Sequence, residues 1–414
     1  MAQATVPTRG AAFRYGLRLG CISFGGPAGQ IAILYRELVE ERGWIGAADF
    51  ARALNFCMLL PGPEALQLVI YLGWRWHGRV GGIVAGLTFL VPGALLVAAL
   101  AWAYLAVGAL APVAALLTGL KAVVVALVAE ALLRIARRAL TGRVSIALAL
   151  AAFLALAFAG LPFPLVILTA ACAGLLGLPR PAAVPVAART GLWRGTLAVL
   201  AVGALLWLLP LAILGVASPD PFPATLYRFL GGAALAGFGG AYAVLAYVGG
   251  ELVHVHRWLS EADFLGGLAL GETTPGPLML VLEFLGFVAG WRHPGTAGAL
   301  AGALLGAALA SWAAFLPSFV LVLAGAPHVE RLAGNPRVGA AFAGVTAAVV
   351  GVIANFALEV ARAVLWPAGA GQPALVPAAI ALAAFALLCR GVGLGWVLAA
   401  GALAGAGAAL AGIG

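Results

Sequence analysis

The stretch "NFCMLLPGPEALQLVIYLGW" (Asn55–Trp74) decides how this chain folds. It is apolar enough to lie inside a membrane, yet Pro61-Gly62-Pro63 interrupts it and Glu64 follows directly. Proline lacks a backbone N–H and glycine adopts conformations that other residues avoid, so the motif ends a helix. The sequence therefore predicts a helix that is broken at membrane depth, with a carboxylate beside the break.

Composition assigns the chain to the integral membrane proteins. It has 414 residues, of which 64% are hydrophobic and 9% charged, and its mean hydropathy is +1.10. Soluble domains carry about 25% charged residues. The net charge of +9 is typical of arginine-rich cytoplasmic loops, so it does not indicate a nucleic-acid partner. Without Walker or HExxH motifs, we expect no catalytic residues, no metal site and no cofactor.

The chain contains an internal repeat. "FGGPAGQIAILYRELVEERGWIGAADFARALNFCMLLPGP" (24–63) aligns without gaps on "FGGAYAVLAYVGGELVHVHRWLSEADFLGGLALGETTPGP" (238–277) at an offset of 214, and 15 of 40 positions are identical. At an offset of 225, Pro92 aligns with Pro317 and Lys121 with Thr346. Two copies of one unit therefore make up the protein. We place the first repeat at 1–178, a linker with a connecting transmembrane helix at 179–217, and the second repeat at 218–414.

The loops between the two units indicate how the copies are oriented. Five segments have the length that a bilayer requires: 82–107, 112–137, 144–160, 163–178 and 194–216. Arginines mark alternate ends of these segments, and such ends face the cytoplasm. Five crossings are an odd number, so the second unit is expected to be inverted, as in secondary transporters. The N-terminus is expected to be cytoplasmic.

The segments on either side of the breaks have two readings. Residues 11–43 and 49–76 carry charges at both ends and a Gly/Pro motif in the middle. If both ends lie on one side, each segment is a re-entrant hairpin of two half-helices; otherwise each is a kinked spanning helix. We favour hairpins. The predicted fold class is thus an all-α membrane protein with about nine full spans plus four hairpins, in two inverted repeats.

A broken helix in the membrane leaves backbone groups unpaired, which is tolerated where the backbone lines a cavity. Half-helices that begin at the breaks present N–H groups and the positive end of the helix dipole, which suit an anion. The alternative is that the motifs only kink packed helices, which four repeated motifs make less attractive. The candidate substrate-binding residues at the breaks are Phe24, Gly25, Gly26, Pro27, Gln30, Pro61, Gly62, Pro63, Glu64, Gln67, Phe238, Gly239, Gly240, Glu272, Thr273, Thr274, Pro275, Gly276 and Pro277.

Charged and hydroxyl side chains near the breaks extend this site. Lys121 lies well inside a predicted span, where a cation is costly and normally has a function or a partner. It can contact an anion, pair with Glu64 or Glu130, or extend to the interface. Glu64 and Glu272 can cap helix dipoles or carry a coupling proton. Threonine hydroxyls and the Gln67 amide are neutral donors that suit an oxyanion.

At these motifs the sequence resembles the chromate ion transporter family in its long two-domain form. The resemblance rests on "SFGGPAGQIAILYRELVEERGWI", "LNFCMLLPGPEALQLVIYLGW", "GLKAVVVAL", "FGGAYAVL" and "LALGETTPGPLMLVLEFLGFVAGW". It implies a multi-pass protein of the bacterial inner membrane with antiparallel halves that exports chromate and confers resistance. One departure is Ala241, which stands where the first copy has Pro27, so the two breaks are not strictly equivalent.

Several functions remain compatible with the sequence. The first is a secondary active transporter of a tetrahedral oxyanion, with chromate favoured by the resemblance and sulfate equally compatible with the residues. The second is a passive anion channel on the same scaffold. Membrane lipid is an expected partner, and a coupling proton is a possible second one. The sequence is also compatible with a homodimer.

Overall fold

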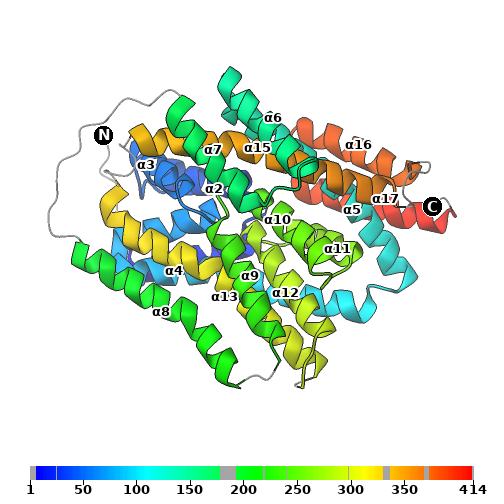
Figure 1. Cartoon of the computed structure of the whole chain (residues 1–414), viewed down its shortest axis with the longest axis horizontal. Coiled ribbons are helices and arrows are strands. Elements are labelled where there is room, and N and C mark those ends of the chain that lie inside the picture. The colour runs from blue at the N-terminus through cyan, green and yellow to red at the C-terminus, as the bar shows by residue number, and fades with distance from the viewer. Residues whose placement is uncertain are drawn as a thin grey trace.

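The computed structural model describes residues 6–24, 26–177, 193–217, 220–238, 240–296, 298–329, 336–367 and 373–412. Their regular structure is entirely helical, and Figure 1 shows the helices packed into one body. The first half contains α1 (Arg9–Ile22), α2 (Gly26–Tyr35), the π-helix η1 (Arg36–Glu41), α3 (Ala47–Met58), α4 (Glu64–Val107), α5 (Ala111–Ala139), α6 (Arg143–Ala157) and α7 (Phe163–Gly177). The helix α8 (Trp193–Ala217) follows, and the second half contains α9 (Phe222–Leu235), α10 (Ala241–Gly250), the π-helix η2 (Glu251–Val255), α11 (Glu261–Glu272), the 3₁₀ turn η3 (Leu278–Leu280), α12 (Val281–Arg292), α13 (Ala299–Gly325), the 3₁₀ turn η4 (Ala326–His328), α15 (Pro336–Leu365), α16 (Leu375–Cys389) and α17 (Leu394–Leu410).

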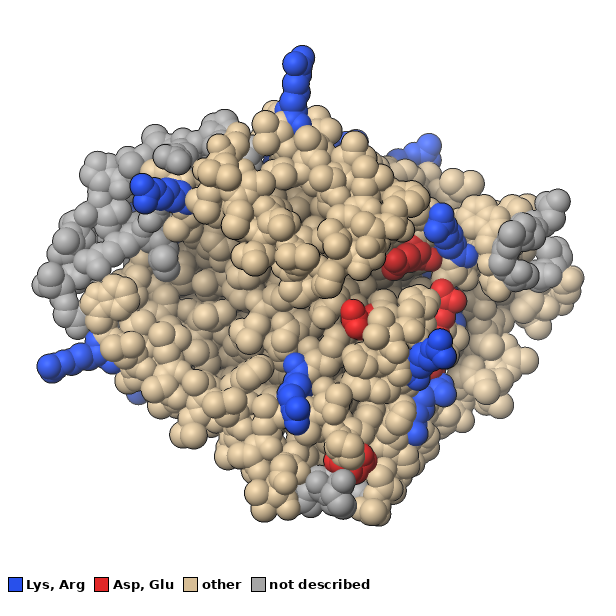
Figure 2. Space-filling view, in the orientation of Figure 1, with Lys and Arg blue, Asp and Glu red and all other residues tan. Residues whose placement is uncertain are grey.

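Five helical segments in the described part of the chain are long and apolar enough to cross a membrane. They are Glu64–Val107, Ala111–Ala139, Trp193–Val216, Ala299–His328 and Pro336–Leu365. The helices α6, α7, α16 and α17 are equally apolar but have only 15 to 17 residues. Most of the face seen in Figure 2 carries no charged residue, and acidic and basic side chains gather in its right half. Both observations fit a protein that is surrounded by lipid.

The segment around the first Pro-Gly-Pro motif folds back on itself. Asp49 at the start of α3 forms an ion pair with Arg75, which lies beyond the break on α4. At His77 and Gly78 the backbone leaves the helical conformation, and Gly78 takes φ +67°, which glycine adopts without strain. Residues 64–76 and 79–107 of α4 are then antiparallel neighbours: a β-carbon on Gly73 would lie 2.5 Å from the Gly81 carbonyl oxygen.

The preceding segment, α1 to η1, also has both ends together. Arg18 and Arg42 lie 3.6 and 3.7 Å from the carboxylate oxygens of the buried Glu37. The Trp44 ring lies edge-on to Tyr15 of α1 and to Trp76 of α4, at centroid distances of 5.5 and 5.7 Å. A charged and aromatic base therefore joins the ends of both segments.

The second half repeats this arrangement. Phe222, at the start of α9, contacts the rings of Trp258 and His293 at 5.2 and 4.3 Å, and Asp263 pairs with Arg292 at 2.7 Å. In Figure 1, α3 lies at the left of the molecule and α11 to the right of its centre. The bases of the two halves therefore lie apart from each other.

The base of the first half yields a stability prediction. Partial burial alone would raise the pKa of the Asp49 carboxyl, but the hydrogen bonds and charges of Arg52 and Arg75 outweigh it and hold that pKa below its usual value. We expect Asp49→Asn to lower the free energy of unfolding by about 1 kcal/mol at neutral pH. Because a lowered folded-state pKa stabilises above the unfolded pKa, the difference should vanish as pH falls through the folded-state pKa. Thermal unfolding in detergent, with the exposed Glu40→Gln as control, checks this; equal melting of Asp49→Asn and wild type at neutral pH would contradict it.

Candidate functional site: the interlocked helix breaks

Four breaks interrupt the helices at the Gly/Pro motifs. We call them break 1 (residues 23–25, between α1 and α2), break 2 (59–63, α3 to α4), break 3 (236–240, α9 to α10) and break 4 (273–277, α11 to η3). Gly25 and Gly239 were predicted to belong to the site but lie outside the described residues. Gly62, Gly240 and Gly276 have φ values of +120°, +98° and +104°, so each needs the conformational freedom of glycine.

The breaks meet in two pairs, each joining the first half to the second. The Gly276 N–H donates to the Ser23 carbonyl at 3.1 Å, and the Gly62 N–H donates to the Gly237 carbonyl at 3.1 Å. The two bonds are related by the repeat, since Gly276 and Gly237 stand 214 positions after Gly62 and Ser23. Break 1 therefore binds break 4, and break 2 binds break 3, with the same local geometry.

Two buried glutamines brace these pairs. The Gln30 Nε2 donates to the carbonyls of Ser23 (3.2 Å) and Gly276 (2.6 Å). The Gln67 Nε2 donates to the Pro61 carbonyl at 2.7 Å and lies 3.5 Å from the Ser318 hydroxyl. The sequence predicted both side chains as substrate ligands; the structure uses these amide donors to hold the breaks together.

A second pair of contacts also crosses between the halves. Gly93 of α4 packs against break 4, and a β-carbon there would lie 2.4 Å from the Pro275 carbonyl oxygen. Ser318 of α13 packs against break 2, with its Oγ 2.4 Å from where a Gly62 β-carbon would be. At the offset of 225, Gly93 corresponds to Ser318. The aligned Pro92 and Pro317 precede these two residues and could have pointed to them.

The helices that begin at the breaks have N-cap residues without capping side chains. Pro63, Gly240 and Pro277 are the N-cap residues of α4, α10 and η3, and none of them supplies a side-chain cap. The first N–H groups of these helices thus lack a side-chain acceptor at the N-cap. The sequence predicted free N–H groups at the breaks, but the N–H groups of Gly62 and Gly276 already donate to carbonyls of the opposite half.

The two carboxylates at the breaks have different surroundings. Glu64 reaches toward the second half: its Oε1 lies 4.0 Å from the position of a β-carbon on Gly240. Glu272 is 4% exposed and accepts a hydrogen bond of 2.7 Å from the Tyr242 hydroxyl, a partner that the sequence reading missed. The hydroxyls of Thr273 and Thr274 donate to carbonyls at the end of α11, those of Leu270 and Gly271, at 2.7 and 2.8 Å.

A cavity of about 380 Å³ opens beside breaks 1 and 4. Phe24, Leu120, Glu272 and Thr273 line it together with residues of α17. Glu272 and Thr273 are the polar residues of this lining, and the others are apolar or glycine. Gly26 and Pro27 begin α2 next to this region.

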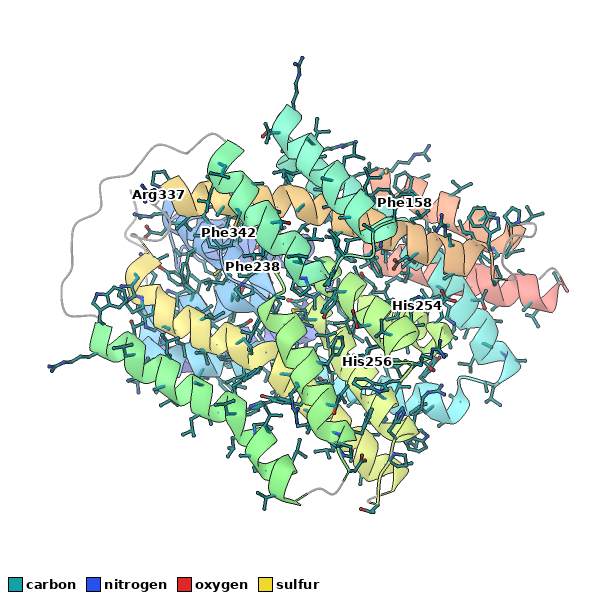
Figure 3. All side chains as sticks on the ribbon, viewed as in Figure 1. Phe158, Phe238, His254, His256, Arg337 and Phe342 are labelled. Atoms are coloured by element: carbon teal, nitrogen blue, oxygen red, sulfur yellow. The ribbon has the colours of Figure 1, made fainter. Side chains whose placement is uncertain are left out.

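Lys121 is the next residue after Leu120 and is half-buried. It is also the only lysine of the chain, since 22 of the 23 basic residues are arginines. No ion pair of Lys121 is present among the residues that the structure describes, and Glu130 pairs instead with Arg134 at 2.7 Å. The equivalent Thr346 donates to the Phe342 carbonyl at 2.8 Å. Figure 3 shows Phe342 beside Phe238 of break 3, with ring centroids 5.7 Å apart.

Comparison with known proteins identifies the chain's relatives. It is 34% identical to a chromate transport protein of Pseudomonas aeruginosa over 84% of this chain and 79% of that protein. It is 29% identical to a chromate transport protein of Cupriavidus metallidurans over 84% of this chain and 81% of that one. A probable chromate transport protein of Synechococcus elongatus is also 29% identical, over 84% of both chains. No solved structure matches the chain.

The family model for the chromate transporter matches residues 10–175 and 224–406. These two ranges contain all four breaks, the cavity-lining residues and Lys121. With apolar helices that can span a bilayer, the chain is a membrane protein, and it belongs to the chromate transporter family.

Proposed function

We propose that this protein is a secondary active transporter that exports chromate, a tetrahedral divalent oxyanion, across the bacterial inner membrane and thereby confers resistance. The observation that carries the proposal is the pair of equivalent hydrogen bonds that join helix breaks of opposite halves. Alternating access needs two similar half-sites that meet at mid-membrane depth. The similarity to chromate transport proteins supports chromate as the anion.

The proposed topology has two inverted repeats, 1–178 and 218–414, joined by 179–217. The folded-back segments 9–43, 47–76, 222–256 and 261–292 are then four re-entrant hairpins, and nine further helices cross the membrane. Two features support this arrangement: α3 and α11, which carry the bases of the two halves, lie apart in Figure 1, and five helical segments lie between the two bases along the chain. The arginine-rich ends support a cytoplasmic N-terminus.

In the proposed site the anion occupies the cavity beside breaks 1 and 4. Backbone N–H groups at the starts of α2 and η3 and the Lys121 ammonium supply positive potential in a place with little competing water. An ionised Glu272 at the cavity wall would repel a dianion unless its carboxyl is protonated or moves away. Anion binding is therefore linked to the protonation and position of that carboxyl. The residues supply no feature that selects chromate over sulfate, so both belong to the substrate class under test.

The test uses the single lysine. In proteoliposomes, Lys121→Gln is expected to reduce chromate flux at least tenfold, because the ammonium of the chain's single lysine, next to the cavity-lining Leu120, is lost; Arg390→Gln, at an exposed position, should leave it unchanged. An amine-reactive probe can modify only Lys121 and the N-terminal amine, and bound chromate or sulfate should protect Lys121. Flux in Lys121→Gln equal to that of wild type, with no protection by either anion, would remove Lys121 from the site.

A channel would behave differently from a carrier. Transport through the proposed carrier should saturate with chromate concentration and should show exchange of internal for external anion. A current that rises linearly with concentration and shows no exchange would identify a passive pore on the same scaffold.

A further inference from the structure

A second buried carboxyl lies outside the breaks, between α12 and α13. Glu283 is 5% exposed, and its Oε2 is 2.7 Å from the Ser311 hydroxyl on α13. Small residues hold the two helices in close contact: a β-carbon on Gly286 would lie 2.5 Å from the Gly306 carbonyl oxygen. Close packing of this kind excludes water from the helix interface.

Among the described residues Glu283 makes no ion pair. Most ionisable groups on the neighbouring helices have other partners. On α11, Asp263 is paired with Arg292 and Glu272 accepts from Tyr242. The helix α9 carries Tyr227, whose hydroxyl donates to the Trp207 carbonyl, and the exposed Arg228. The cations of α4 are engaged elsewhere, since Arg75 pairs with Asp49 and Arg79 donates to the Gly195 carbonyl. The other ionisable residues of α4 are Glu64, Tyr71, His77 and Tyr104, and the Tyr104 hydroxyl bonds to Asp263.

An ionised carboxylate without a cation is strongly disfavoured at membrane depth, whereas a neutral carboxylic acid paired with a hydroxyl is tolerated. In the corresponding helix pair of the first half, residues 64–76 and 79–107, no acidic residue follows Glu64. Glu283 is therefore a polar group that the second half has and the first half lacks.

We propose that Glu283 is the proton-binding site that couples proton entry to anion export, an inference that rests on the proposed function. The carboxyl takes a proton from water on the outer side, carries it as the neutral acid hydrogen-bonded to Ser311, and releases it to water on the cytoplasmic side. The carboxylate that remains is then ready for the next proton.

The position of Glu283 suits such coupling. It lies six residues after Pro277, which is about 9 Å along a helix, so the proton and the anion have separate sites on one hairpin. A movement of that hairpin which exposes break 4 to one side also carries Glu283. Proton release and anion binding can therefore alternate without direct contact between the two ligands.

The test measures two fluxes in the same proteoliposomes: exchange of labelled chromate, and proton movement reported by a pH dye trapped inside. In wild type, chromate movement against a gradient should be accompanied by proton movement in the opposite direction. Glu283→Gln keeps a partner for Ser311, so chromate exchange should stay within about twofold of wild type while chromate-linked proton movement falls at least tenfold. Glu261→Gln, at the exposed start of α11, should behave as wild type.

The remaining outcomes overturn the proposal. Proton movement in Glu283→Gln equal to wild type, or chromate exchange in wild type without any proton movement, removes Glu283 from coupling. Loss of exchange in both Glu283→Gln and Glu283→Asp assigns a structural role instead. An absence of chromate exchange in wild type would reject the proposed function itself, and the proton site with it.

Discussion

Replacing Gly93 by alanine is expected to reduce chromate flux at least tenfold, although alanine favours helix formation by about 1 kcal/mol over glycine. Gly93 lies within α4 in an ordinary helical conformation, so the substitution causes no backbone strain there. The new β-carbon would lie 2.4 Å from the Pro275 carbonyl oxygen and 2.7 Å from Leu280 Cδ1. Because the first of these is a backbone atom, break 4 must shift away from α4, at a cost of about 1–3 kcal/mol.

A matched glycine separates this effect from a general change in helix stability. Gly215 in α8 has no atom within 4 Å of a built β-carbon, so Gly215→Ala should retain wild-type flux and melt no lower than wild type. Flux in proteoliposomes and thermal unfolding in detergent measure both variants. If Gly93→Ala transports chromate as fast as Gly215→Ala, close packing of α4 on break 4 is not needed for transport.

Replacing Gln30 by glutamate is expected to abolish transport and to lower the melting temperature further than Gly93→Ala or Asp49→Asn does. Gln30 is 2% exposed, and its Nε2 donates to the carbonyls of Ser23 and Gly276. An ionised glutamate would present an acceptor to two acceptors, and a protonated one could satisfy only one of them. The Ser23 carbonyl keeps the Gly276 N–H as a donor, but the Gly276 carbonyl loses the Gln30 amide, and a buried carbonyl left without a donor costs about 1–3 kcal/mol.

Gln30→Met provides a graded comparison, because it has similar length and removes the donor without adding a charge. Its melting temperature and its flux should fall between those of wild type and Gln30→Glu. The reverse order, or a Gln30→Glu protein that keeps more than half of the wild-type flux, would show that the contact between breaks 1 and 4 can be lost without consequence.

The predicted helices and breaks are present in the structure because they depend on local composition. The spans predicted at 112–137 and 163–178 correspond to α5 and α7 within a few residues. Each Gly/Pro motif stands between two helices, since proline and glycine interrupt a helix wherever they occur in this pattern. The span predicted at 144–160 ends too late, because α6 ends at Ala157. Gly160, which follows it, has a φ of +59°.

The roles of the predicted polar residues depended on packing. Gln30 and Gln67 were expected to face an anion, but their amide donors hold backbone carbonyls at the breaks. Tyr242 and Glu283 are engaged with Glu272 and Ser311, and the sequence reading singled out neither. The partner of a buried polar side chain lies on another helix, so it cannot be predicted before the packing of the helices is known.

Three properties of the protein follow from its residues alone: it lies in a membrane, it consists of two copies of one unit, and four breaks interrupt its helices. They depend on hydropathy, on identity at a fixed offset and on the backbone chemistry of proline and glycine. Which breaks pair is a property of the folded molecule. The Gly62–Gly237 and Ser23–Gly276 hydrogen bonds join backbone groups that every non-proline residue possesses. Residue identity therefore carries no record of these partners, and the packing of the two halves selects them.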